Sequence, residues 1–188
     1  MQKLISQLEK YTPFNEQEER DKNTILNLLK TQPDIFERSN LIAHMTASAW
    51  VVNKDRSKIL LAYHNIYDSW AWLGGHADGE KDLLKVALKE VAEESGVKNI
   101  KPVSEDILSV EILTVDGHEK KGVYVPSHLH LNVTYLIEAD DTEQPHICVG
   151  ENSNVAWFDK DKAVEMSNEK WFKERIYSKL MKKLYPGD

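Results

Sequence analysis

Residues 74–97 read GGHADGEKDLLKVALKEVAEESGV, and this stretch decides the fold. It begins with a glycine pair and ends in three crowded carboxylates, Glu90, Glu93 and Glu94. The C-terminus of a helix carries partial negative charge, and like charges three or four residues apart repel, so each contact is unfavourable by roughly some tenths of a kcal/mol. The carboxylates therefore need an explanation other than helix stability.

The same stretch predicts a helix over residues 82–95. Its apolar residues recur at intervals of three and four and make one buried stripe, Leu84, Ala87, Leu88 and Val91. Asp78 can cap the beginning of this helix, and Gly96 is the residue type that ends a helix in a left-handed conformation. We expect the three glutamates on a flank that borders the buried stripe.

Carboxylates gathered beside a glycine turn form the all-oxygen kind of site that binds Mg²⁺ or Mn²⁺. Such an ion would offset the repulsion, bind phosphate oxygens and activate water for hydrolysis of a phosphoanhydride. The alternative is a solvated acidic helix face, which is the usual place for a run of charges.

The composition limits the class of protein. With 188 residues, of which 41% are hydrophobic, the chain suits one domain with a sizeable core. No apolar run approaches the roughly 18 residues that span a bilayer, and the N-terminal MQKLISQLEK lacks a signal-peptide pattern, so no membrane partner is expected. The single cysteine, Cys148, excludes an internal disulfide. We therefore expect a cytoplasmic protein.

The formal net charge of −7 argues against a nucleic-acid polymer as partner. It leaves room for a small phosphorylated ligand, because a divalent metal brings local positive charge into an acidic site. A small phosphorylated substrate is the expected partner.

Periodicity divides the chain into an N-terminal helical extension, residues 1–40, and a module at residues 41–188. Residues 2–37 predict two helices, and Asn15 and Glu18 have the spacing of a capping box at the start of the second. The apolar stripe of this extension could pack on the module, or against a second copy of the chain in a homodimer.

Beyond residue 41 the pattern changes to the period of two that is typical of strands. In residues 44–52 it places His44, Thr46, Ser48 and Trp50 on one face. Further strands are predicted at 58–64, 107–115, 128–138 and 154–158, and further helices at 160–167 and 168–184. The last helix has an apolar stripe beside a row of lysines that includes Lys179 and Lys183, which indicates a packing helix with a basic face.

The strand at 128–138 puts His128 and His130 on one face. With His76 they could bind zinc, although a set of only three neutral ligands favours hydrogen-bonded residues in a cleft or on the surface. The sequence leaves both interpretations open.

Residues 75–97 resemble the Nudix box, whose pattern is G-x5-E-x7-R-E-U-x-E-E-x-G-U, with U a bulky aliphatic residue. Seven of the nine defined positions match, namely Gly75, Glu90, Val91, Glu93, Glu94, Gly96 and Val97. The resemblance extends over roughly residues 42–165. It implies an α+β fold, the α/β/α sandwich in which a mixed β-sheet lies between helices.

Two positions depart from the pattern. Lys81 stands where the family has Glu, and Lys89 where it has Arg. Lysine keeps the charge of arginine but not the forked geometry that holds two carboxylates. Glu80 or Asp82, each one residue away, could supply the missing carboxylate if the loop shifts.

The resemblance implies one or more Mg²⁺ or Mn²⁺ ions bound by Glu90, Glu93, Glu94 and the backbone carbonyl of Gly75. Glu90 or Glu93 would be the general base that acts on water, and Lys89 would take the orienting role of the arginine. The implied substrate is a nucleoside diphosphate linked to another group, cleaved within its pyrophosphate.

Residues near the box and in later segments are candidates for substrate binding, namely Trp70, Trp72, His76, His128, His130 and Glu151. The tryptophans would stack on a nucleobase or, alternatively, fill the core. The histidines would contact phosphate or base. The glutamate resembles a supplementary acidic residue of some Nudix enzymes, or is a solvated loop residue.

Two rival functions share the implied fold. A catalytically silent diphosphate-binding module would explain Lys81 and Lys89. The second rival is an isopentenyl diphosphate isomerase, whose chemistry implies a site with a catalytic cysteine. It is disfavoured because the single cysteine, Cys148, lies late in the chain, outside any matching motif.

Overall fold

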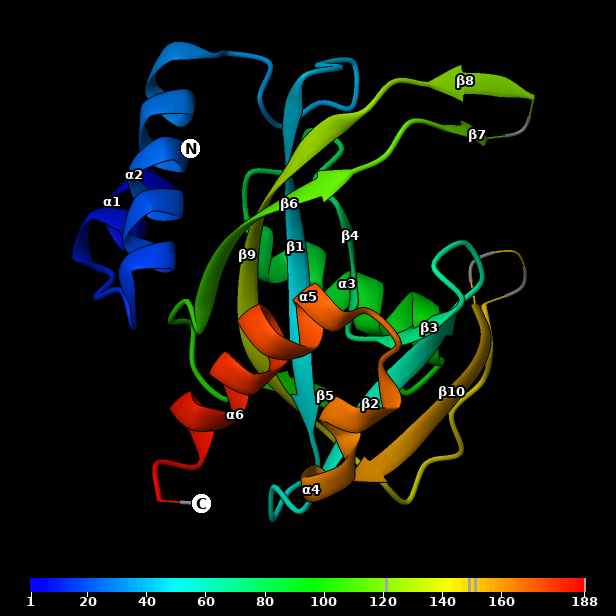
Figure 1. Ribbon diagram of the computed structural model, residues 1–188. Coiled ribbons are helices and arrows are strands. Elements are labelled where there is room, and N and C mark those ends of the chain that lie inside the picture. The colour runs from blue at the N-terminus through cyan, green and yellow to red at the C-terminus, as the bar shows by residue number, and fades with distance from the viewer. Residues whose placement is uncertain (121, 149, 151, 188) are drawn as a thin grey trace.

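The computed structural model describes residues 1–120, 122–148, 150 and 152–187, and Figure 1 shows a mixed β-sheet between helices. The helices are α1 (Gln2–Lys10), α2 (Glu16–Thr31), α3 (Leu83–Ser95), α4 (Lys160–Ala163), α5 (Lys170–Phe172) and α6 (Ser178–Leu184), with the 3-10 turn η1 (Val164–Met166) and the π turn η2 (Lys173–Tyr177). The strands are β1 (Ala43–Val52), β2 (Lys58–His64), β3 (Ser69–Ala71), β4 (Leu73–His76), β5 (Ile100–Pro102), β6 (Ser109–Val115), β7 (His118–Lys120), β8 (Val123–Val125), β9 (His128–Ala139) and β10 (Asn152–Asp159). No helix in these described residues is both long and apolar enough to cross a membrane.

β1 and β9 form the centre of the sheet. They run parallel, from Ala43 opposite Leu129 to Val52 opposite Glu138. Every residue of β1 is buried, because other elements cover both faces of the sheet here.

Antiparallel strands extend the sheet on both sides of this pair. The order is β10-β2-β1-β9-β5, and in addition β4 pairs with β1, β3 with β2 and β6 with β9. The strands predicted from alternation are confirmed as β1, β2, β6, β9 and β10. The sequence does not predict β3, β4, β5 and the β7–β8 hairpin, because strands of three or four residues are too short to show a period.

Helices cover the two faces of the sheet through different apolar clusters. α3 packs its Ala87 and Val91 in the cluster that holds Met45, Ala47 and Leu73. The C-terminal helices cover the other face, in a cluster of Trp50, Val52, Ile59, Leu61, Leu113, Ala163, Ile176, Tyr177 and Leu180. These layers confirm the α+β class and the α/β/α sandwich.

The C-terminal helices lie where they are predicted, but parts of them are 3-10 and π turns instead of α-helix. The predicted helix at 160–167 is α4 followed by a 3-10 turn, and the one at 168–184 begins at Lys170. It then changes to π geometry over Lys173–Tyr177 before α6. Ile176 and Tyr177, which lie in this π turn, are fully buried.

The N-terminal helices end earlier than predicted. α2 ends at Thr31, and residues 32–37 are not α-helical. Oδ1 of Asn15 accepts the N–H of Glu18 at 3.0 Å, which is half of the predicted capping box. The other half is not made, because Oε2 of Glu18 accepts the N–H of Phe14 at 2.7 Å.

Both N-terminal helices bury their apolar faces within the chain. Their residues in the cluster that also holds α3 are Leu4, Ile5, Leu8, Ile25 and Leu29. The stripe that could have faced a second copy is therefore covered, and a homodimer stays a prediction. The division of the chain at residue 40 also stays a prediction.

A buried ion-pair network joins the N-terminal and C-terminal helices. Nζ of Lys179 lies 3.0 Å from Oε1 of Glu18 and 2.9 Å from Oε1 of Glu111. Nζ of Lys183 also pairs with Oε1 of Glu18. Burial alone would raise the pKa of Glu18, but these lysines and the Phe14 amide outweigh it and lower the pKa to about 2. The predicted basic face is therefore wrong for these two lysines, because distant acidic residues fold onto them.

Candidate active site

The glycine pair of β4 meets both β1 and α3. Gly74 lies opposite Ser48, and Gly75 lies opposite Ala47. A Cβ atom on Gly74 would lie 2.5 Å from the carbonyl oxygen of Ala47, and one on Gly75 would lie 2.4 Å from Cδ of Glu90. At Gly74 the neighbour is backbone, so only glycine fits there, whereas at Gly75 the neighbour is the end of a flexible side chain.

α3 buries the predicted stripe, but its buried face is centred slightly to one side of it. Its buried residues are Leu83, Val86, Ala87, Val91, Glu94 and Ser95, whereas Leu84 and Leu88 are half-buried. Glu94 thus lies within the buried face, because residues 83, 87, 91 and 94 also follow helical spacing. The left-handed end at Gly96 is confirmed, with a φ of 69°.

Glu94 is fixed at the meeting point of α3, β4 and β10. The residue is 8% exposed, and its Oε2 accepts the N–H of Gly74 at 2.9 Å. Its backbone carbonyl accepts Nδ2 of Asn152 at 2.9 Å. The carboxylate is therefore held beside the glycine pair rather than solvated.

Lys89 lies between the other two glutamates. Its Nζ is 3.4 Å from Oε1 of Glu90 and 3.0 Å from Oε2 of Glu93. The hydrogen bond to Glu93 is the main cause that raises the pKa of Lys89. The side chain of Glu90 is 13% exposed and that of Glu93 is 54% exposed, so Glu93 is the carboxylate that water reaches most easily.

The loop before α3 differs from its prediction. Asp78 does not cap α3: its backbone has a φ of 46°, and its carboxylate pairs with Arg38. The N-cap is Asp82, without a side-chain hydrogen bond. The prediction of Asp78 as the cap is wrong because α3 begins at Leu83, which leaves Asp78 four residues before the N-cap and paired with Arg38.

Neither candidate for the missing carboxylate turns toward the glutamates in this structure. Glu80 binds Lys85 at 2.7 Å and the N–H groups of residues 81 and 82, which lower its pKa to about 2. Oδ2 of Asp82 lies 3.5 Å from Nζ of Lys3, so this carboxylate pairs with the N-terminal helix. At a rise of 1.5 Å per residue, Asp82 is about 12 Å along the helix from Glu90. The candidate acidic site is therefore limited to Glu90, Glu93 and Glu94.

Four histidines gather on the opposite face of the sheet. His44 of β1 lies opposite His130 of β9, two residues after His128, and Thr46 lies opposite His76 of β4. Residues two apart on a strand share a face, so the four rings point to one side. Their candidate ligand atoms lie within 4.8 Å of one another, which holds for no other set of three or more His, Cys, Asp or Glu among the described residues.

Two rings of this four-histidine cluster are fixed by backbone carbonyls. Nδ1 of His44 lies 2.9 Å from the oxygen of Asn40, and Nδ1 of His128 lies 2.8 Å from that of Pro126. A carbonyl only accepts, so Nδ1 carries the proton and Nε2 keeps the lone pair. Nε2 of His128 lies 3.2 Å from Nε2 of His130, whereas Nε2 of His44 is buried without a hydrogen-bond partner.

The pKa values of two imidazoles in this cluster are lowered. Burial, followed by the neighbouring histidines, lowers the pKa of His130 to about 2. Burial also lowers the pKa of His44. The sequence predicts three members of this cluster, but not His44, because the parallel pairing of β1 with β9 is not visible in a single sequence.

The polar face beyond the histidines is satisfied internally. Oδ1 of Asn132 accepts the hydroxyls of Thr46 at 2.9 Å and Ser48 at 3.0 Å. Nδ2 of Asn132 and the hydroxyl of Thr134 both donate to Oε2 of Glu111. This network leads from the four-histidine cluster to the buried ion pairs under α6.

The two tryptophans pack under the C-terminal helices. Trp70 lies edge-on to Phe158, with ring centroids 4.7 Å apart, and to Tyr63 at 5.4 Å. Trp72 lies edge-on to Tyr177 at 5.6 Å. Both are half-buried and belong to the second apolar cluster, as the core-filling alternative predicts. Stacking on a nucleobase stays a prediction.

The segment before β10 carries two further candidates. Glu151 lies outside the described residues, so its role stays a prediction. The N–H of Cys148, which is half-buried, donates to Oδ1 of Asn152 at 3.0 Å. Because Asn152 also binds the backbone of Glu94, this segment is tied to the acidic end of α3.

Comparison with known proteins agrees with this geometry. The NUDIX domain family matches residues 43–180, which is more than half of the chain. No curated protein matches the sequence.

Solved structures show the same fold. The chain is similar to a C. elegans Ap4A hydrolase binary complex, with a TM-score of 0.51 and 19% identity over 74% of this chain and 93% of that one. It is also similar to a NUDIX-family hydrolase from Clostridium perfringens, with a TM-score of 0.50 and 20% identity over 73% of this chain and 95% of that one. The chain belongs to the NUDIX family, and its enzyme class is that of a Nudix-type pyrophosphohydrolase.

Proposed function

We propose that the protein is a divalent-metal-dependent hydrolase that cleaves the pyrophosphate linkage of a nucleoside diphosphate derivative or a similar small diphosphate. The observation that supports this most is the placement of Glu94. A carboxylate 8% exposed at a helix C-terminus, fixed by the N–H of Gly74, is not a solvated surface charge.

The residues at this site suit Mg²⁺ or Mn²⁺. Glu90, Glu93 and Glu94 offer only oxygen donors, and Gly75 brings its backbone against the carboxylate of Glu90. A divalent ion held there would supply positive charge to the phosphate oxygens and promote deprotonation of water. The side chain of Lys89 is 60% exposed and has room to move aside when an ion takes over its charge.

The side chains of the acidic site have different proposed roles in the reaction. Glu93 is the most exposed of the three carboxylates, and we assign it the general base, with Glu90 as the alternative. Lys89 contacts both and holds them in place. Glu94 is the least mobile of the three because its side chain and backbone are both hydrogen-bonded.

The expected substrate is small. A formal net charge of −7 disfavours a nucleic-acid polymer, and the single cysteine agrees with the proposed cytoplasmic location. Contacts of substrate with Trp70, Trp72, Glu151 and the histidines stay predictions.

One observation favours a second candidate, a diphosphate-binding module without turnover. Lys89 already places a cation 3.4 Å and 3.0 Å from the carboxylates that would share a metal ion. If this amine is not displaced, the site would bind a diphosphate without hydrolysing it.

A substrate panel tests the proposal. Release of phosphate or nucleoside monophosphate would be measured for nucleoside diphosphate derivatives, including the Ap4A named for the C. elegans relative, with Mg²⁺, Mn²⁺ or chelator. We expect at least one compound to release product with Mg²⁺ or Mn²⁺, and we expect chelator to abolish that release. Binding without release across the panel would overturn the hydrolase and support the silent module.

A further inference from the structure

Packing alone does not explain the four-histidine cluster. His44 is 4% exposed, and its Nε2 has no hydrogen-bond partner while its Nδ1 is held by the carbonyl of Asn40. A buried polar atom without a partner destabilises the fold, because it has lost its hydrogen bonds to water and gained none in return. The ring centroids of the other three histidines lie 4.8 to 5.1 Å from that of His44, and an electron-pair acceptor bound among these rings would give the nitrogen a partner.

The arrangement of nitrogen atoms suits a tetrahedral ion. Zn²⁺ with four histidine ligands at about 2.05 Å places neighbouring nitrogens about 3.3 Å apart. Nε2 of His128 and Nε2 of His130 lie 3.2 Å apart, and all four ligand atoms lie within 4.8 Å of one another. For a tetrahedral ion, the atoms farthest apart in this set would have to approach one another by up to about 1.5 Å.

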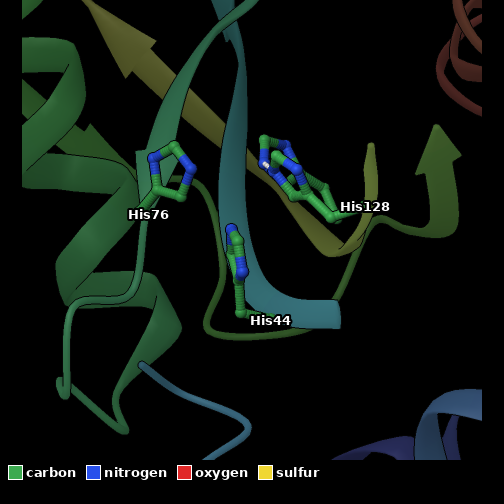
Figure 2. A group of neighbouring side chains, drawn as sticks. His44, His76 and His128 are labelled. Atoms are coloured by element: carbon green, nitrogen blue, oxygen red, sulfur yellow. Dashed lines mark hydrogen bonds between the residues drawn. The ribbon is translucent and has the colours of Figure 1, made fainter. Parts of the chain in front are cut away.

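Figure 2 shows the labelled rings of His44, His76 and His128 around one space, with His44 between the other two. They come from β1, β4 and β9, and the ring centroid of His44 lies 5.1 Å, 4.8 Å and 5.1 Å from those of His76, His128 and His130. We propose that these four histidines bind one transition-metal ion of the zinc type, at a site separate from the acidic site of α3.

The ligand set selects the class of ion. Four imidazoles without a carboxylate suit zinc and related transition metals and disfavour the hard ions Mg²⁺ and Mn²⁺. The carbonyls of Asn40 and Pro126 fix the Nδ1 protons of His44 and His128, as hydrogen-bond acceptors beside metal-bound histidines commonly do.

The position of the cluster indicates a structural ion. Four protein ligands fill a tetrahedral site and leave no place for substrate. The ligands come from three strands, so an ion would link the beginning of β1 and β9 to the end of β4. Gly75 contacts Glu90 on the face that α3 covers, so the two sites lie on opposite faces of the sheet.

Metal content tests this inference directly. The protein, without a histidine tag, would be stripped with chelator, incubated with Zn²⁺, passed over a desalting column and measured by elemental mass spectrometry. We expect about one zinc ion per chain for the wild type. We also expect Zn²⁺ to raise its melting temperature and Co²⁺ to give the visible absorption of a tetrahedral site.

Matched variants identify the ligands. His44→Ala and His128→Gln should each lose the bound zinc and the cobalt absorption, whereas His146→Gln, at an exposed histidine, and Glu94→Gln should retain both. His128→Gln serves as a second test if His44→Ala does not fold. No retained zinc in the wild type, or zinc that only Glu94→Gln removes, would overturn the proposal.

Discussion

Gly75 of β4 lies against the carboxylate of Glu90 so closely that a Cβ atom would be 2.4 Å from Cδ and 2.5 Å from Oε2. This contact places a glutamate of α3 directly on the strand that leads into the helix. It couples the first residue of the motif to a residue in the middle of α3, which follows 15 residues later in the chain.

Gly75→Ala should therefore displace the carboxylate of Glu90. Because that carboxylate ends a flexible side chain, we expect the protein to fold with little change in melting temperature. Turnover should fall by roughly 10 to 100-fold, as for other residues that position metal ligands. Steady-state kinetics and thermal unfolding would check this together.

The double variant shows whether the loss acts through Glu90. In a Glu90→Gln background, Gly75→Ala should cause little further loss, since the displaced group is already changed. Full activity of Gly75→Ala would show that the contact has no role in the reaction.

Lys89 should act by holding Glu90 and Glu93. We expect Lys89→Gln to lower turnover by roughly 10 to 100-fold, and Lys89→Arg to retain it, because a guanidinium can reach both carboxylates. The matched control is Lys85→Gln on the same helix, where the lysine pairs with Glu80 instead. Higher turnover in Lys89→Gln would mean that the amine competes with the metal ion.

The buried network should make stability depend on pH. The pKa of Glu18 is lowered from 4.5 to about 2, so its contribution to the free energy of unfolding is complete above pH 4.5 and is lost as pH falls toward 2. The shift corresponds to about 3 kcal/mol. Denaturant unfolding at a series of pH values would measure the free energy of unfolding of both proteins. Glu18→Gln should fall furthest below the wild type above pH 4.5, and the difference should shrink toward pH 2.

Glu16→Gln is the control for this measurement. Glu16 forms an exposed pair with Arg20, which contributes little to stability. A constant difference between Glu18→Gln and the wild type from pH 7 to pH 2 would contradict the assignment of the low pKa to Glu18.

The sequence predicts the local parts of this structure well. α3, its end at Gly96 and the long strands follow from periodicity and from one motif. The contact of Gly75 with the end of α3 is also implied within that motif. These features depend on residues close together in the chain, so a single sequence contains the information.

Features that depend on distant segments are not predictable in this way. His44 meets His130 only because β1 pairs in parallel with β9, and Lys179 is buried only because Glu18 reaches it from α2. The sequence places Glu94 on the flank of α3 rather than in its buried face, because the spacing of apolar residues does not fix the rotation of a helix to within one residue. Glu18 also pairs with Lys179 and Lys183 from the distant C-terminal helices, and its predicted role in a capping box gives no sign of these contacts.

The central claim is that the acidic end of α3 carries the reaction, and the most direct test is the turnover of Glu93→Gln and Glu94→Gln in saturating Mg²⁺ or Mn²⁺. A glutamine at 94 can still accept the N–H of Gly74, so both variants should unfold like the wild type. We predict that each loses metal-dependent turnover by roughly two orders of magnitude or more. Unchanged turnover in both, or turnover abolished instead by His128→Ala and His130→Ala together with loss of bound zinc, would contradict the account.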